Sequence, residues 1–135
     1  MEEKRTDSVC LDTNVLLRFL LEDDSVLYIQ AKKVFKEAER GQLLIYLDEV
    51  ILAEAIWVLL SVYKLEKQVI CQIMTKLLVC KWLVNPRKEL MLKSIGLWAK
   101  TKLHYPDCWL FILSGSLGFG MKTFDLDLMR MAREK

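Results

Sequence analysis

The stretch VCLDTNVLLRFL, residues 9–20, decides the fold of this chain. Its first three residues are apolar and of strand character, and the run ends abruptly at Asp12. Beyond the acid, Val15, Leu16 and Phe19 recur at the spacing of one face of a helix. The stretch therefore predicts a strand, a turn at the acid and a helix.

The same succession of strand, acid and helix returns further along the chain. Residues 43–47 form a continuous apolar run without alternation, which is typical of a parallel strand covered on both faces, and Asp48 follows it. Shorter strands are expected at 83–84 and 122–124. The remaining helices are expected at 25–40, 48–63, 66–81, 87–102, 107–116 and 126–134. Because strands alternate with helices, we expect an α/β fold of three layers (α/β/α) around a central parallel sheet of about four short strands.

Length and composition favour one globular domain over residues 1–135. The chain has a mass of 15.8 kDa and 53% hydrophobic residues, enough for a core, and its 28% charged residues supply a polar surface. Neither a signal peptide nor a membrane-length apolar run is recognisable, so we expect a cytoplasmic location. The net charge of +2 neither demands nor excludes a nucleic-acid partner.

Three of the predicted strands end in an aspartate, at Asp12, Asp48 and Asp125. Aspartate is favoured at a helix N-terminus, so each has an ordinary capping explanation, which we assign to Asp48. Glu54 needs another explanation, because the residues three and four positions away on its predicted helix are apolar. Its carboxylate must face water, contact a distant partner or bind a metal ion.

Asp107 adds a fourth acid at the start of a predicted helix, and a parallel sheet gathers such residues at one edge. Carboxylates about 5 Å apart would repel one another by roughly 3 kcal/mol at an effective dielectric of about 20. A divalent cation is the natural counter-charge. Ligands that are all oxygens favour Mg²⁺ or Mn²⁺, and the presence of a single histidine argues against zinc.

The acids occur in four short motifs: LDTNVLLR at 11–18, LAEAIWVL at 52–59, PDCWL at 106–110 and TFD at 123–125. In order and spacing these motifs resemble those of the PIN domain family, especially its VapC-type toxins. The resemblance implies an endoribonuclease that hydrolyses RNA with Mg²⁺ or Mn²⁺ and is neutralised by an antitoxin protein. On this sequence it implies four catalytic and metal-binding acids, Asp12, Glu54, Asp107 and Asp125, with polar support from Thr13, Asn14 and Thr123.

Several assignments stay open at this point. Asp127 could take the place of Asp125, and Arg18, one helical turn beyond Asn14, could contact an RNA phosphate or simply face solvent. The richness in leucine, isoleucine, tryptophan and methionine favours a homodimer or a complex with the antitoxin. The alternative function is a non-catalytic PIN-like module that binds RNA or pairs with another protein.

Overall fold

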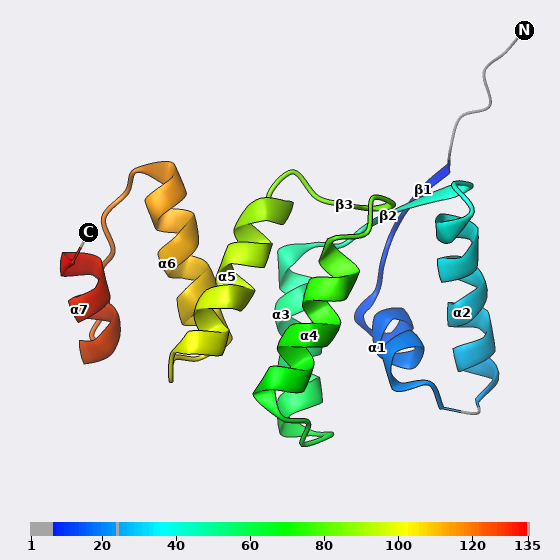
Figure 1. Ribbon diagram of the computed structural model, residues 1–135, viewed down its shortest axis with the longest axis horizontal. Helices are drawn as coiled ribbons and strands as arrows, with labels where there is room; N and C mark the ends of the chain where they lie inside the picture. The colour runs from blue at the N-terminus through cyan, green and yellow to red at the C-terminus, as the bar shows by residue number, and fades with distance from the viewer. Residues whose placement is uncertain (1–6, 24, 135) are drawn as a thin grey trace, which may run out of the picture.

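The computed structural model describes residues 7–23 and 25–134 (Figure 1). In chain order its elements are β1 (Asp7–Cys10), α1 (Thr13–Leu21), α2 (Val26–Glu39), β2 (Leu43–Tyr46), α3 (Glu49–Ser61), α4 (Lys67–Leu78), β3 (Leu83–Val84), α5 (Lys88–Lys100), α6 (Tyr105–Leu117) and α7 (Leu126–Arg133). Each predicted helix is found, with ends within a few residues of the predicted limits. Hydrophobic periodicity therefore located the helices correctly.

The three strands form one parallel sheet in the order β1-β2-β3, with β2 in the centre. The register pairs Cys10 with Tyr46 on one side of β2 and Ile45 with Leu83 on the other. Just past β1, the amide of Leu11 donates a hydrogen bond of 3.0 Å to the carbonyl of Tyr46. The predicted α/β class is thus confirmed as a small parallel sheet among many helices.

The predicted strand at 122–124 is not a strand in the structure. Residues 119–125 link α6 to α7 without regular secondary structure, and Phe124 is fully exposed. A strand needs a neighbour for its backbone hydrogen bonds, and β1, β2 and β3 pair only among themselves. The described part of the chain therefore has a sheet of three strands where about four were expected, and the three-layer arrangement stays a prediction.

Helix ends follow local chemistry. Asp48 caps α3, because its Oδ2 accepts a hydrogen bond of 3.0 Å from the amide of Val50, which confirms the capping role predicted for it. Gly41, just past α2, and Gly118, at the end of α6, adopt left-handed φ angles of 78° and 70°. Residues with a Cβ rarely adopt such angles, so these two glycines fix where the chain leaves its helix.

Aromatic side chains join helices that are consecutive in the sequence. Phe35 of α2 stacks on Phe19 of α1 with ring centroids 3.8 Å apart, and it meets Trp82 edge-on at 5.7 Å. Further along, Trp98 of α5 meets Tyr105 of α6 edge-on at 5.9 Å. Between these contacts, one cluster of buried apolar residues extends from the strands to α5 and α6.

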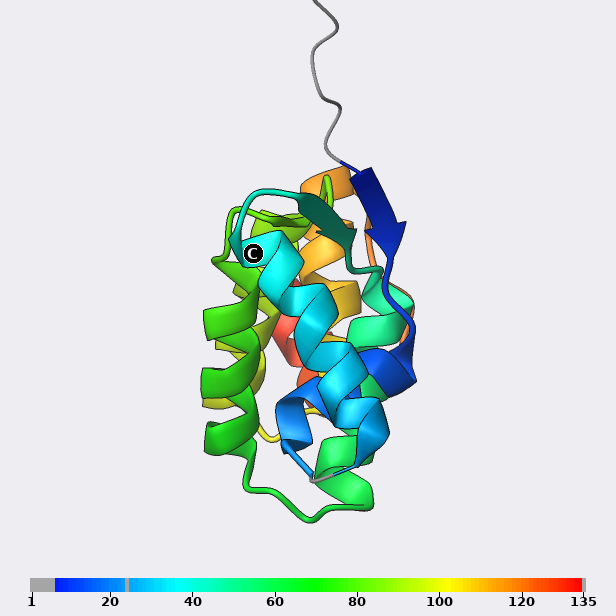
Figure 2. The ribbon, with the colours of Figure 1, turned by 90° about the vertical axis from the view of Figure 1, so that its right-hand side faces the viewer.

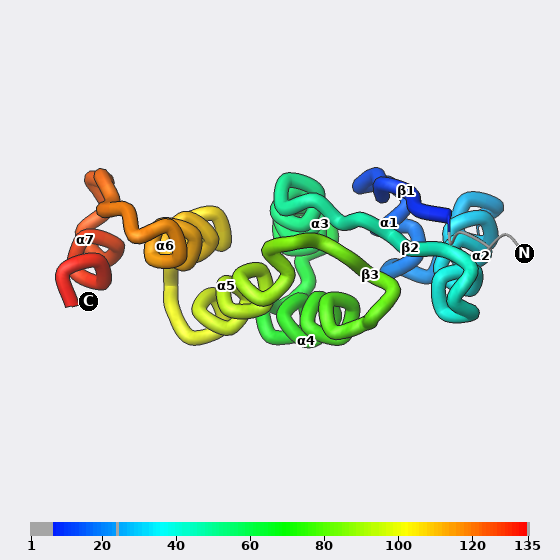
Figure 3. Tube along the Cα trace, turned by 90° about the horizontal axis from the view of Figure 1, so that it is seen from above, coloured from blue at the N-terminus to red at the C-terminus, as the bar shows by residue number. Residues whose placement is uncertain are grey.

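The molecule is elongated. Figure 1 and the view from above in Figure 3 place β1, α1 and α2 towards one end and α6 and α7 at the other. Figure 2 looks along the molecule from the end that carries β1. In between, α5 packs against both α4 and α6. No helix in the described ranges has the length and apolar character needed to cross a lipid bilayer.

Candidate active site

Asp12 and Thr13 stand where β1 passes into α1, at the carboxyl end of the strand. Asp12 is the N-terminal cap of α1, and its Oδ1 accepts a hydrogen bond of 2.6 Å from the amide of Asn14. The Asp12 side chain is exposed, so its second oxygen stays accessible from solvent. The capping and functional interpretations of this residue are therefore compatible.

Glu54 lies on α3, which packs against α1. Oγ1 of Thr13 donates a hydrogen bond of 2.9 Å to Oε2 of Glu54, across 41 positions of sequence. The sequence did not identify the partner of this glutamate, and the structure shows that it is a hydroxyl from the first acidic motif. The structure brings the first and second motifs together at the carboxyl end of β1.

Asp107 occupies the first turn of α6, and its side chain is half-buried. Its helix packs against α3 and, more extensively, against α5. Pro106 next to it is at the start of the helix, where the missing amide hydrogen costs nothing. Asp107 therefore lies on a helix adjacent to that of Glu54.

Asp125 is the N-terminal cap of α7, and this helix lies at the end of the molecule opposite β1 (Figure 1). It caps α7 by accepting a hydrogen bond of 2.9 Å from the amide of Leu128, and its own amide donates to Oγ1 of Thr123 at 3.1 Å. Asp127 is exposed in the first turn of α7. Thr123 thus supports Asp125 locally, and neither Asp125 nor Asp127 is hydrogen-bonded to Asp12 or Glu54 in the described structure.

Arg18 forms an ion pair with Asp23, an acid that the four motifs do not include. Its Nη1 lies 2.6 Å from Oδ2 of Asp23, and Asp23 also accepts a hydrogen bond from the hydroxyl of Ser25. The Ser25 hydroxyl first, and then the Arg18 guanidinium, hold the pKa of Asp23 below its usual value. This ion pair fixes the turn between α1 and α2, so a phosphate contact by Arg18 would have to replace it.

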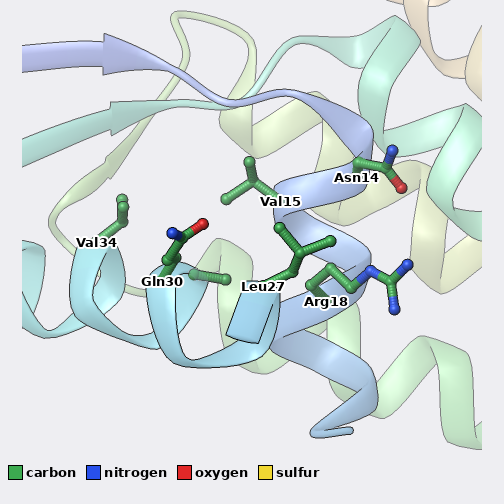
Figure 4. Close-up of a pocket in the computed structure, with 7 residues that line it drawn as sticks. Asn14, Val15, Arg18, Leu27, Gln30 and Val34 are labelled. Carbon is green, nitrogen blue, oxygen red and sulfur yellow. The ribbon is translucent and has the colours of Figure 1, made fainter. Parts of the chain in front are cut away.

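A groove that the motifs did not predict lies between α1 and α2. It has a volume of about 220 Å³ and is lined by Asn14, Val15, Arg18, Leu27, Gln30, Ala31 and Val34 (Figure 4). Leu27 lies on the same face of α2 as the buried Ala31 and Phe35 and yet is 52% exposed at the groove. The sequence signal is thus an amphipathic face, which does not by itself show that one of its leucines is left uncovered.

The ordered acids, the parallel sheet and the contact between the first two motifs agree with one family. A family model described as PIN domain matches residues 9–134. The chain belongs to the PIN domain family. PIN domains are generally nucleases that act on RNA or DNA, which supports a nuclease role for this chain. No curated protein and no solved structure matches it.

PIN domain nucleases usually use divalent metals, and the donor atoms of Asp12, Glu54 and Thr13 are of the oxygen type that Mg²⁺ and Mn²⁺ prefer. Within residues 7–23 and 25–134, however, no three side chains of His, Cys, Asp or Glu gather closely enough to hold a metal ion. The Thr13–Glu54 hydrogen bond thus joins the first two motifs, but the side chains of the described residues do not fit a complete metal site.

Proposed function

We propose that this PIN domain, one domain over residues 1–135, is an endoribonuclease whose site is anchored by Asp12 and Glu54. The observation that carries the proposal is the 2.9 Å hydrogen bond from Thr13 to Glu54, because it joins two motifs that the sequence holds far apart. Both residues are exposed, and Asp12 stands with Thr13, the partner of Glu54, at the carboxyl end of β1, where α/β proteins commonly bind their ligands. An RNA backbone can therefore reach them.

The proposed activity depends on Mg²⁺ or Mn²⁺. The proposed catalytic and metal-binding acids are Asp12, Glu54, Asp107 and Asp125, and the supporting residues are Thr13, Asn14 and Thr123. Four carboxylates in one place repel one another, and a divalent cation is the counter-charge that their oxygens favour. Asp127 is the alternative to Asp125, and Arg18 is a candidate phosphate contact if the RNA displaces it from Asp23.

A cleavage assay with matched variants tests the proposal. Purified protein is incubated with total RNA in Mn²⁺, in Mg²⁺ and in excess EDTA. We expect cleavage only with the metals, and its loss in Asp12→Asn and Glu54→Gln. Asp48→Asn is the control, because Asp48 caps a helix after the neighbouring strand and asparagine caps equally well. Cleavage that persists in EDTA, or in both site variants, would refute the proposed chemistry.

The non-catalytic alternative has one observation in its favour, namely that no three side chains of His, Cys, Asp or Glu gather closely enough to hold a metal ion in the described part of the chain. A PIN-like module of this kind would bind RNA or a protein without hydrolysing the phosphodiester bond. RNA binding without cleavage in either metal would support it. The same assay therefore separates the two functions.

We further propose that the nuclease is the toxin of a toxin–antitoxin pair acting in the cytoplasm. The support is the apolar groove between α1 and α2, which opens beside Asn14 and gives an inhibitory protein a surface next to the site (Figure 4). Induction of the chain in a bacterial host should arrest growth, and Asp12→Asn should relieve the arrest. Equal growth arrest by the parent and by Asp12→Asn would contradict this role.

A further inference from the structure

The outer edge of β1 has no strand beside it. Within the described chain β1 pairs with β2 alone, and all four of its residues are exposed, including Val9 at 38% and Cys10. Such an edge presents a row of unpaired amide and carbonyl groups that can accept another parallel or antiparallel strand. In this molecule the edge leads directly to Asp12.

The same region carries exposed apolar side chains around Glu54. Val50 and Trp57 lie four residues before and three residues after Glu54 on α3, and they are 69% and 62% exposed. Residues at these spacings share one face of a helix. The face that carries Glu54 is thus apolar on both sides of the acid and open to solvent.

The other end of the molecule carries the complementary features. Residues 119–125, here called the linker arm, have no backbone hydrogen bond to another main-chain group between 120 and 124 in the described structure. Phe119 and Phe124 on the arm, and Leu126 next to it, are 68%, 102% and 75% exposed. Phe124 and Leu126 are the sequence neighbours of Asp125, whereas Val50 and Trp57 share a helix face with Glu54. Each acid therefore lies beside apolar side chains that are exposed to solvent.

The arm is held away from the β1 edge of its own chain. Helix α7 packs against α6, where Leu128 is 1% exposed, and both helices lie at the end of the long axis opposite β1 (Figures 1 and 3). The arm could reach its own β1 only if α7 gave up this packing. A second copy can reach it without any such change.

We propose that the linker arm of a second copy adds to β1 as a fourth parallel strand and brings its Asp125 to Asp12 and Glu54. The idea that Asp125 completes the site rests on the nuclease function proposed above; the strand pairing does not. Asp12 and Asp125 each stand two residues beyond Cys10 and Thr123, so with the acids level these two residues lie opposite each other.

The arrangement closes as a dimer. One molecule has the strand edge at one end and the arm at the other, so two copies lying side by side in opposite directions satisfy both surfaces at once. Each copy then receives one arm and donates one, which is the self-complementary geometry of a two-fold dimer. The predicted homodimer thus acquires a role, since each site contains residues of both copies.

Disulfide cross-linking tests the pairing without relying on activity. Cys71 and Cys108 are buried, and Cys80→Ser removes the partly exposed thiol, which leaves Cys10 on the β1 edge. In this background, we expect mild oxidation of Thr123→Cys to give a covalent dimer. The control is Lys36→Cys, an exposed position on α2, which should stay largely monomeric. An intrachain cross-link, no cross-link to Cys10, or an equal dimer yield from the control would overturn the proposal.

Complementation between inactive variants tests the shared site. Asp12→Asn and Asp125→Asn are co-expressed and allowed to form mixed dimers. One site of each mixed dimer then holds both intact acids, so about one quarter of the parental activity should return, because about half of the dimers are mixed. Co-expression of Asp12→Asn with Glu54→Gln is the control, since both changes damage the half-site of their own chain, and it should restore nothing.

The two tests separate the failure of this inference from that of the proposed function. If the parent cleaves no RNA, the nuclease proposal fails, and the cross-link to Cys10 still decides whether the arm pairs with a second copy. If the parent cleaves RNA but the complementing pair does not regain activity, the shared site is refuted while the nuclease function stands.

Discussion

The hydroxyl of Thr13 donates a hydrogen bond of 2.9 Å to Oε2 of Glu54, which links the start of α1 to the middle of α3. No cation in the described chain neutralises this glutamate, because the ion pairs found there join Arg18 to Asp23 and Arg87 to Glu49. A neutral donor orients the carboxylate without cancelling its charge. Glu54 therefore keeps its capacity to bind a cation while its position is fixed.

Removal of the Thr13 hydroxyl should impair the proposed nuclease more than it impairs folding. Thr13→Val keeps the shape but loses the donor that orients the Glu54 carboxylate. We expect kcat/KM for RNA cleavage to fall about tenfold or more, since about 1.4 kcal/mol corresponds to a factor of ten. The unfolding free energy should change by less than about 1 kcal/mol, because Glu54 can turn to water.

Thr13→Ser is the matched control, because it retains the hydroxyl and should keep most of the activity. Both quantities can be measured on the same preparations, by initial cleavage rates and by urea unfolding. Equal activity of the valine and serine variants would show that the contact does not position Glu54.

Two substitutions of Asp12 should separate its capping role from its functional role. Asparagine caps a helix as well as aspartate does, so Asp12→Asn should leave the unfolding free energy nearly unchanged while it abolishes cleavage. Asp12→Ala loses the 2.6 Å acceptor for the amide of Asn14 and should cost about 1 kcal/mol of stability in addition. Thermal and urea unfolding of the two variants measure the difference. Equal stability of both variants would mean that the cap contributes little.

Local patterns predicted most elements of the fold because each carries its own signal. The parallel strands at 43–46 and 83–84 are short apolar runs between polar turns, and Asp48 is a cap with its amide partner two residues away. The helices follow from apolar spacing. The strand predicted at 122–124 could not be judged from local sequence alone, since a strand forms only where a neighbouring strand is present.

Local sequence likewise predicted only part of the candidate site. Sequence order pointed to Glu54, and the structure supplied its partner, which no local pattern could identify because Thr13 is 41 residues away. The positions of Asp107 and Asp125 depend on how α6 and α7 pack, and no three acids gather into a metal site among the described residues. Leu27 lies on the apolar face of α2 with Ala31 and Phe35 and yet is 52% exposed, because periodicity identifies an apolar face and not what covers it.

The ion pair between Glu49 and Arg87 should make stability depend on pH in the acid range. Partial burial alone would raise the pKa of Glu49, but hydrogen bonds from Arg87, from its own backbone and from Asn85 outweigh burial and lower the pKa below 4.5. The folded protein therefore favours the charged form. This contribution is present above pH 4.5 and is lost as the pH falls through the lowered pKa of the folded state.

Arg87→Met should reduce the unfolding free energy near neutral pH by about 1 kcal/mol or less, because the Arg87 side chain is 45% exposed and solvent screens the pair. The difference from the parent should shrink as the pH falls below 4.5. Lys93→Met, which removes an exposed cation from α5, is the control and should show a smaller difference at every pH. A constant difference for Arg87→Met across this range would contradict the linkage.

The buried contact between Tyr105 and Ser94 should govern stability in alkali. The hydroxyl of Ser94 donates to the carbonyl of Met91 at 2.7 Å, so the Tyr105 hydroxyl is the donor in the 2.9 Å bond to Ser94. Burial raises the pKa of Tyr105 to about 12. Folding thus favours the neutral phenol, and this stabilisation is complete below pH 10.0, the ordinary pKa, and is lost as the pH rises towards 12.

Tyr105→Phe removes both the hydrogen bond and the titration. At pH 7 it should cost about 1 kcal/mol, the usual net contribution of a buried hydrogen bond, since Ser94 keeps its bond to Met91. Between pH 10 and 11 the parent should lose up to about 1.4 kcal/mol more than the variant, because each pKa unit corresponds to that free energy. The other tyrosines titrate in both proteins and cancel in the comparison. Urea unfolding at pH 7, 10 and 11 measures both effects, and parallel losses in the two proteins would show that Tyr105 ionises freely in the fold.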